Sequence, residues 1–117
     1  MKGEAKMKKV FTSVKEIFEG MSGVFNPNAA AGLNTVIQYS IEGDQGGDWY
    51  VVIKDQACTV SVGTHPSPAL TMRMADKDWI AMCNGELNGM TAFMTGKLKT
   101  KGDLMLAQRL AMLFPLG

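Results

Sequence analysis

A helical period governs the hydrophobic residues near the start of the chain. Those that share one helical face are Val10, Val14, Ile17, Phe18 and Met21. Charged side chains occupy much of the remaining circumference, so the pattern predicts an amphipathic helix over residues 8–22, ended by Gly23. The sequence Asn26-Pro27-Asn28 then predicts a short capped helical turn, because proline is favoured at the first helical position.

The hydrophobic period changes to two after this turn, which is typical of strands. The segments with strand character are 37–41, 49–53, 58–62 and 70–74. Four consecutive strands joined by turns predict an antiparallel meander. The face expected to be buried carries Ile37, Tyr39, Ile41, Leu70, Met72 and Met74. The glycine-rich turn at 43–48 leads into a strand, so we interpret it as a hairpin loop and not as a phosphate-binding loop.

Helical patterns return after residue 75. Asp76 is expected to cap a helix over 77–83, and Asn88 to cap a second short helix that Gly96 ends. The core side of the first of these helices would carry Trp79, Ile80, Met82 and Cys83.

The last predicted elements are a charged strand and an apolar helix. Lys97, Lys99 and Lys101 share one face of an extended segment, which is typical of an edge strand protected by charge. Asp103 is expected to cap the final helix, which Pro115 can end. One stripe on that helix carries Leu106, Leu110, Leu113 and Phe114. A neighbouring stripe carries Leu104, Gln108 and Ala111. A helix apolar over so much of its circumference should face more than a sheet.

Composition indicates one compact domain, and the strands and helices predicted above make its class α+β. The chain has 117 residues, 46% of them hydrophobic, and a net charge of +1. This charge gives no field of the kind that a dedicated nucleic-acid binder needs, so no nucleic acid is expected as a partner. We expect a flexible segment over 1–7 and a single domain over 8–117. A cytoplasmic location is expected, because the sequence shows no signal peptide, no transmembrane segment and no C-terminal peroxisomal signal.

The two cysteines predict neither a metal site nor a cofactor. Cys58 and Cys83 are isolated, without CxxC spacing, and His65 is the only histidine. Packing of at least one cysteine in the core is the simplest interpretation. An enzyme would need a nucleophile and a base. The only candidate pairs are Cys58 with His65 and Cys83 with Asp78, and neither pair has a supporting motif. We therefore expect no enzyme, no metal and no cofactor.

Methionine usage adds a further expectation. Ten methionines occur, mainly after residue 71, which gives the C-terminal half an adaptable apolar surface. Together with the apolar last helix, this predicts an apolar interior larger than packing alone requires. A methionine-rich ordinary core or a dimer interface is the alternative.

The element order and several motifs resemble the sterol carrier protein type 2 family of lipid-binding domains. The most specific motif is Gly96-Lys97-Leu98-Lys99-Thr100-Lys101-Gly102-Asp103, supported by segments 85–88 and 106–110. The turn at 43–49 and the segment 72–76 also resemble the family, and the likeness covers roughly residues 8–114. It implies a five-stranded, mostly antiparallel sheet, covered on one face by about five helices that enclose a hydrophobic tunnel.

The resemblance also implies a function: binding and intracellular transfer or presentation of fatty acids, fatty acyl-CoA or sterol-like lipids, without catalysis. The residues that it assigns to lipid binding are Phe18, Met21, Trp49, Met82, Met90, Phe93, Met94, Leu106, Gln108, Leu110 and Phe114. Gln108 would be the single polar contact, unless it is simply an exposed helix residue. An accessory or dimerisation module that docks on a lipid-metabolising enzyme is the alternative. The protein would be a monomer or weak homodimer, and Lys97, Lys99 and Lys101 could contact anionic membranes.

Overall fold

The computed structural model describes residues 10–114. Its elements, in order, are α1 (Val14–Val24), the 3-10 helix η2 (Pro27–Ala30), β1 (Thr35–Glu42), β2 (Gly47–Lys54), β3 (Ala57–Val62), β4 (Leu70–Ala75), α2 (Asp76–Cys83), α3 (Gly89–Met94), β5 (Leu98–Gly102) and α4 (Leu104–Leu113). The expected flexible segment 1–7 and the helix stop at Pro115 lie outside the described residues.

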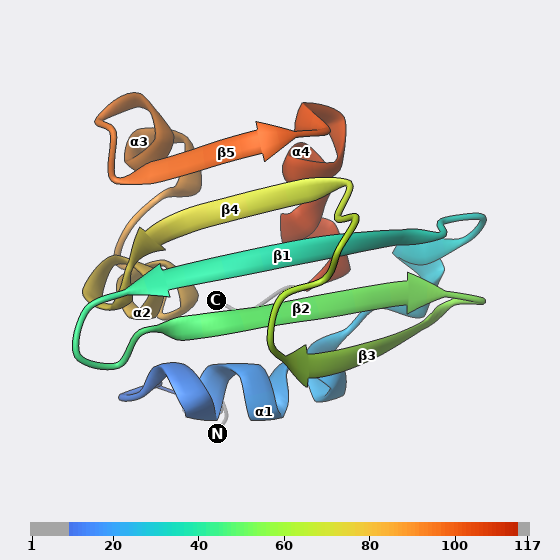
Figure 1. Ribbon diagram of the computed structural model, residues 1–117, viewed down its shortest axis with the longest axis horizontal. Coiled ribbons are helices and arrows are strands. Elements are labelled where there is room, and N and C mark those ends of the chain that lie inside the picture. Colours follow the sequence, from blue (N-terminus) through green and yellow to red (C-terminus); the bar gives the residue numbers. More distant parts are fainter. Residues whose placement is uncertain (1–9, 115–117) are drawn as a thin grey trace, which may run out of the picture.

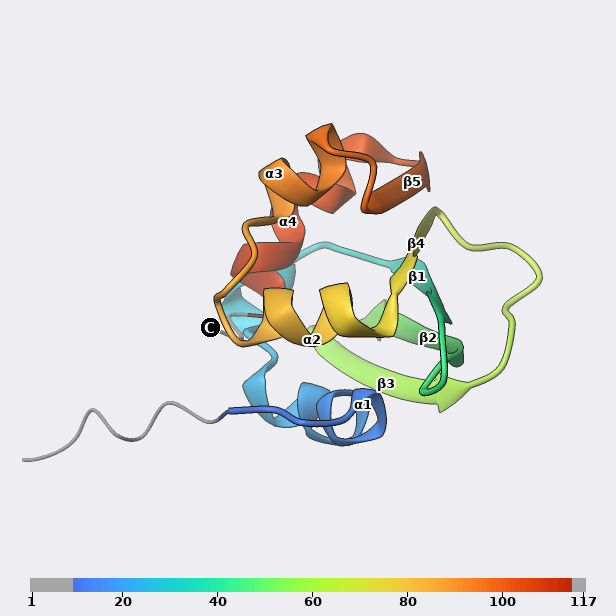
Figure 2. The same cartoon turned by 90° about the vertical axis from the view of Figure 1, so that its left-hand side faces the viewer.

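The domain has two layers, a five-stranded sheet and a layer of helices on one of its faces (Figures 1 and 2). Three of the four strand pairings are antiparallel, so the predicted fold class is confirmed. The described residues form four α-helices and one 3-10 helix. The face expected to be buried is also confirmed, because Ile37, Tyr39, Ile41, Leu70, Met72 and Met74 are all buried.

The predicted meander of four strands is wrong. The strand order is β3-β2-β1-β4-β5, and β4 pairs parallel with β1 instead of antiparallel with β3. The chain reaches β4 by crossing the outer face of the sheet in the loop 63–69 (Figure 2).

Gln38 fixes this crossover. Its side chain is buried beneath the loop, where its Nε2 donates to the carbonyl oxygens of Trp49 at 3.1 Å and Gly63 at 3.0 Å. Its Oε1 accepts from the amide N–H of His65 at 2.8 Å. A polar side chain that satisfies three backbone groups is stable in a buried position. It therefore holds the loop over the sheet and places β4 beside β1.

Two helices begin at other residues than the spacing predicts. α1 begins at Val14 and not at residue 8, because Ser13 caps it: Ser13 Oγ accepts from Glu16 N at 3.1 Å, and Glu16 Oε1 accepts from Thr12 N at 3.1 Å. α1 also continues past Gly23 to Val24. The predicted caps at Asn26, Asn88 and Asp103 are confirmed by side-chain hydrogen bonds to the first turns of their helices.

Asp76 is the first residue of α2 and not its cap. Its carboxylate instead accepts from the amide N–H groups of Gln45 at 2.9 Å and Lys77 at 2.8 Å. The bond from Gln45 fastens α2 to the turn between β1 and β2. Gly43 makes the close approach possible, since a Cβ there would lie 2.5 Å from Asp76 Oδ1.

The strand predicted at 97–101 is β5, displaced by one residue to Leu98–Gly102, and it is an edge strand as expected. Lys97, Lys99 and Lys101 are exposed, whereas Leu98 is buried on the side of the helices. On α2, Trp79 and Cys83 are buried as predicted, and Ile80 and Met82 are only half-buried.

Candidate functional site

A cavity of about 730 Å³ lies between the helices and the sheet. Its sheet wall is formed by Tyr39 of β1, Met72 of β4, and Leu98 and Thr100 of β5. Because side chains alternate across a strand, these residues point to the helix side of the sheet. The opposite walls come mainly from α2, α3 and α4, with Met21 of α1 completing them.

Seven of the eleven residues predicted to bind lipid line this cavity: Met21, Met82, Met90, Phe93, Gln108, Leu110 and Phe114. The other four lie elsewhere. Leu106 is buried in the core, Met94 is 76% exposed on α3, and Phe18 and Trp49 line a smaller pocket. Met94 lies outside the cavity, whereas Met90 and Phe93 of the same helix line it.

The two predicted stripes of α4 do not correspond to one core face and one cavity face. Leu106 and Leu113 pack into the core, whereas Leu104, Gln108 and Ala111 of the second stripe line the cavity together with Leu110. Gln108 is exposed, which places its amide at the rim. Alternation along the sequence could have identified Tyr39, Met72, Leu98 and Thr100 as cavity residues. The first two lie on the face expected to be buried, and Leu98 and Thr100 alternate with the three lysines of the edge strand.

Phe18 separates the cavity from the smaller pocket. Its ring stacks on Trp49, with centroids 4.7 Å apart, and also on Trp79, with centroids 5.4 Å apart. It contacts Tyr39 edge-on at 5.3 Å. Since Tyr39 and Trp79 line the larger cavity and Trp49 lines the smaller pocket, this aromatic cluster forms the wall between the two.

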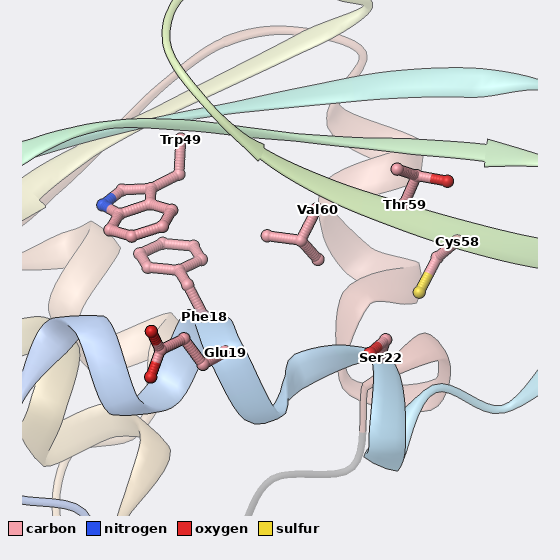
Figure 3. A pocket seen from close by; sticks show the side chains of 7 residues that line it. All are labelled: Phe18, Glu19, Ser22, Trp49, Cys58, Thr59 and Val60. Carbon is pink, nitrogen blue, oxygen red and sulfur yellow. The ribbon is translucent and has the colours of Figure 1, made fainter.

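The smaller pocket, of about 330 Å³, lies between α1 and the strands β2 and β3 (Figure 3). The stacked rings of Phe18 and Trp49 stand at one end, and Ser22 and Cys58 at the other. Glu19 also lines this pocket, so it is more polar than the larger cavity.

The larger cavity has a neutral lining. Among the described residues that line it, none is Asp, Glu, Lys, Arg or His. Burial raises the pKa of the Cys83 thiol to about 12 and raises the pKa of the Tyr39 hydroxyl as well. Both groups are therefore protonated at neutral pH, and the site offers no ionic partner to a ligand.

The candidate pair Cys58 and His65 is not assembled. Cys58 points to the helix side of β3, whereas His65 lies in the crossover loop on the opposite face of the sheet. Cys83 is held as a neutral thiol, which is a poor nucleophile. Within residues 10–114, no group of three or more His, Cys, Asp or Glu residues could hold a metal ion. In the same range, no helix has the length and apolar character of a membrane span.

Known proteins share both the sequence pattern and the fold. Hydroxysteroid dehydrogenase-like protein 2 from Danio rerio is 34% identical over 98 residues, which cover 83% of this chain and 24% of that protein. Palmitated Sterol Carrier Protein 2 Like 2 from Aedes aegypti is 30% identical with a TM-score of 0.70, covering 86% of this chain and 93% of that one. The sec-alkylsulfatase Pisa1 from Pseudomonas sp. shares the fold, with a TM-score of 0.73 at 20% identity over 90% of this chain and 16% of its own.

The chain spans about a quarter of the length of the curated relatives that it matches. Its residues 15–115 match the SCP-2 sterol transfer family. With the α+β fold and the apolar cavity between its layers, this match shows that the chain belongs to the SCP-2 sterol transfer family.

Proposed function

We propose that the domain binds long-chain apolar lipids in the 730 Å³ cavity and carries or presents them without transforming them. The observation that carries the proposal is the uncharged, methionine-rich lining under α2, α3 and α4. Methionine side chains are flexible, so they can adapt to fatty acyl, acyl-CoA or sterol-like ligands. The palmitated relative supports an acyl chain as one occupant.

The size of the cavity supports a bound molecule. The cavity is partly open to solvent and has room for many water molecules, so its volume of about 730 Å³ is not an empty void. The space therefore holds lipid or water. A ligand CH₂ that leaves water contributes about 0.8 kcal/mol, so longer chains should bind more tightly until the cavity is full.

Mass spectrometry of lipids extracted from the purified protein, together with titration of a fluorescent fatty acid, tests this function. Ala111 lines the cavity on α4, and the neighbouring Met112 is exposed and lies outside it. Ala111→Trp should fill the cavity and lower probe affinity at least about tenfold. Met112→Trp, the control, should bind like the wild type. Clean extracts together with no probe binding would exclude the carrier function.

Gln108 supports a polar contact at the rim. Its exposed amide can hydrogen-bond a head group that remains in water while the chain of the ligand is buried. Gln108→Leu should weaken a fatty acid more than a hydrocarbon of equal length. Equal losses for both would show that Gln108 makes only apolar contacts.

The lysines of the β5 edge support transient contact with an anionic membrane. Lys97, Lys99 and Lys101 are exposed, and within the described part of the chain none forms an ion pair. Each lysine near an anionic surface contributes about 1 kcal/mol. Sedimentation with phosphatidylserine vesicles should therefore exceed sedimentation with phosphatidylcholine vesicles, and replacing all three lysines by glutamine should remove the difference.

The length of the relatives favours a second candidate, a module that serves a lipid-metabolising enzyme. The matching region makes up only 24% of the Danio rerio protein. Light scattering distinguishes the two roles: a carrier should remain a monomer or weak dimer with and without lipid, whereas a docking module should form a defined complex with its enzyme.

A further inference from the structure

Tyr39 brings a hydroxyl group to the sheet wall of the larger cavity. The residue is 1% exposed, and it lines this cavity but not the smaller pocket. Its Oη has no hydrogen-bond partner within the described residues. In that part of the chain, Trp79 Nε1 is the one buried side-chain N or O atom that lacks both a partner and contact with any space large enough for water. Tyr39 Oη, which also lacks a partner, therefore touches such a space, and the cavity is the space that Tyr39 lines.

Packing fixes the position of this hydroxyl. The Tyr39 ring meets Phe18 edge-on, with centroids 5.3 Å apart, and its centroid lies 5.1 Å from that of Trp79. Both neighbours are buried, so the ring cannot swing aside without opening the core. Rotation of a phenol ring about its own axis does not move the oxygen. The hydroxyl is therefore a fixed feature of the cavity surface.

The other polar side chains of the lining differ from Tyr39 in position or in strength. Asn88 and Gln108 are exposed, and Thr100 is half-buried on the edge strand, so water can reach these three groups. Cys83 is buried, but a thiol is only a weak donor. Among the described residues that line the cavity, Tyr39 therefore offers the strong donor that is best shielded from bulk water.

The surroundings of Tyr39 determine which acceptor it suits. Burial raises the pKa of its hydroxyl, so the group keeps its proton and can donate. None of the described lining residues carries a charge. An ionised carboxylate beside Tyr39 would lose its hydration without gaining a cation, which is unfavourable. A neutral oxygen loses far less and still accepts the hydrogen bond.

We propose that Tyr39 Oη donates a hydrogen bond to an uncharged oxygen of the bound lipid, such as a ketone, hydroxyl or ester carbonyl. A pure hydrocarbon leaves the hydroxyl unpaired in the wall, whereas an oxygenated lipid satisfies it. This inference rests on the proposed lipid-binding function and deepens it. Neutral oxygenated lipids bind with the oxygen at Tyr39, and ionised fatty acids bind with the carboxylate at the rim near Gln108.

Three ligands of equal carbon number test this selection: dodecane, decyl methyl ketone and dodecanoate. Tyr39→Phe keeps the ring and removes only the hydroxyl. It should weaken the ketone about three- to tenfold and leave dodecane and dodecanoate nearly unchanged. Tyr50→Phe is the matched control, because Tyr50 is half-buried beside His65 and does not line the cavity, and it should leave all three affinities unchanged. An equal loss for all three ligands in Tyr39→Phe, or an unchanged ketone affinity, would overturn the inference.

Infrared spectroscopy of the bound ketone, labelled with ¹³C at its carbonyl, gives a readout that packing alone does not move. A hydrogen bond lowers the carbonyl stretching frequency, so the band in the wild-type protein should lie below its position in hexane. Tyr39→Phe should return the band toward the hexane position, and Tyr50→Phe should not.

A band at the hexane position in the wild-type protein would refute the hydrogen bond without any variant, while leaving lipid binding intact. A band that stays low in Tyr39→Phe would assign the bond to another donor and would also overturn the proposal. Failure of all three ligands to bind to the wild-type protein would instead refute the proposed function.

Discussion

The rings of Phe18 and Trp49 lie nearly parallel, with an interplanar angle of 11° and centroids 4.7 Å apart. Phe18 also contacts the wall of the larger cavity through Tyr39 and Trp79. One side chain of α1 therefore packs against the wall of the larger cavity and anchors the helix to the sheet. We expect stability and cavity size to be linked at this position.

Replacement of Phe18 should reveal that link. Phe18→Ala should lower the free energy of unfolding by about 3–5 kcal/mol, because it leaves a void between two existing hollows. Glu19→Ala, one residue further along α1, removes only an exposed ion pair with Lys15 and should cost less than about 0.5 kcal/mol. Urea denaturation measures both. A Phe18→Ala loss no larger than that of the control would show that the cluster is not the wall described.

Two methionines of α3 form a matched pair for the cavity itself. Met90 and Met94 are 62% and 76% exposed, but only Met90 lines the cavity. Met90→Ala should weaken a fluorescent fatty acid roughly threefold through lost apolar contact, and Met94→Ala should not change its affinity. Equal effects in a fluorescence titration would mean that exposure alone, and not position, governs binding.

The crossover loop should depend on Gln38. Gln38→Leu removes three hydrogen bonds and leaves buried backbone groups unpaired, so we expect a loss of about 2–4 kcal/mol. Hydrogen exchange at the His65 amide should accelerate at the same time. Gln56→Leu removes a single exposed bond to the Pro27 carbonyl and serves as the control, with a loss below about 1 kcal/mol. An unchanged His65 exchange rate would contradict this role of Gln38.

The two cysteines should differ in reactivity. With a pKa of about 12, only about one Cys83 thiol in ten thousand is ionised at pH 8. Iodoacetamide, which attacks the thiolate, should therefore modify half-buried Cys58 first and reach Cys83 only when the chain unfolds. In a Cys58→Ser variant, the labelling rate of Cys83 should rise about tenfold per pH unit while the fold persists. Rapid labelling at pH 8, read by mass spectrometry, would contradict the buried position.

Asp76 should make stability depend on pH in the acid range. Hydrogen bonds from the backbone, first of all from Gln45 N, hold the pKa of this carboxyl below its usual value. Its contribution is therefore fully present above the unfolded pKa of about 3.9 and is lost as pH falls through the lower folded value. Asp76→Asn should flatten the dependence of the urea midpoint on pH in this window, and Asp78→Asn should not. If the urea midpoint depended on pH equally in the two variants, Asp76 would not be the cause of the acid dependence.

Local patterns predicted the elements of this fold better than their connections. The inward faces of β1 and β4 follow from alternation, and the caps at Asn88 and Asp103 follow from residue type. The start of α1 was misplaced because Val10 fits the helical spacing, although it is 68% exposed and precedes the cap at Ser13. Ser13 and Glu16 have the Ser-x-x-Glu spacing of a capping box, which is readable in the sequence, although Glu16 accepts from Thr12 N and not from the N–H of Ser13. The spacing of hydrophobic residues predicts that a helix is present, whereas the capping residues show where it begins.

Pairing and site geometry depend on long-range contacts that periodicity cannot express. The alternation of β4 is the same whether it pairs with β3 or with β1. The structure pairs it with β1, and the hydrogen bonds of Gln38 to the crossover loop are formed in that arrangement. Hydrophobic spacing identified the apolar residues of α4, but it could not show that Leu106 packs into the core while Ala111 lines the cavity. That division depends on how α4 packs against η2, β4 and β5, which short local patterns do not fix.

The parallel pairing of β1 with β4 also sets the order in which the domain can fold. Hairpins β1–β2 and β2–β3 join neighbouring segments, whereas Ile37 meets Leu70 only after the intervening chain has closed a long loop. Closure of such a loop costs entropy before any contact offsets it, so we expect the three-strand unit to form early and β4 with the segments after it to dock late. Most of the cavity wall comes from that late half. We therefore expect the cavity to be completed only in the last step of folding.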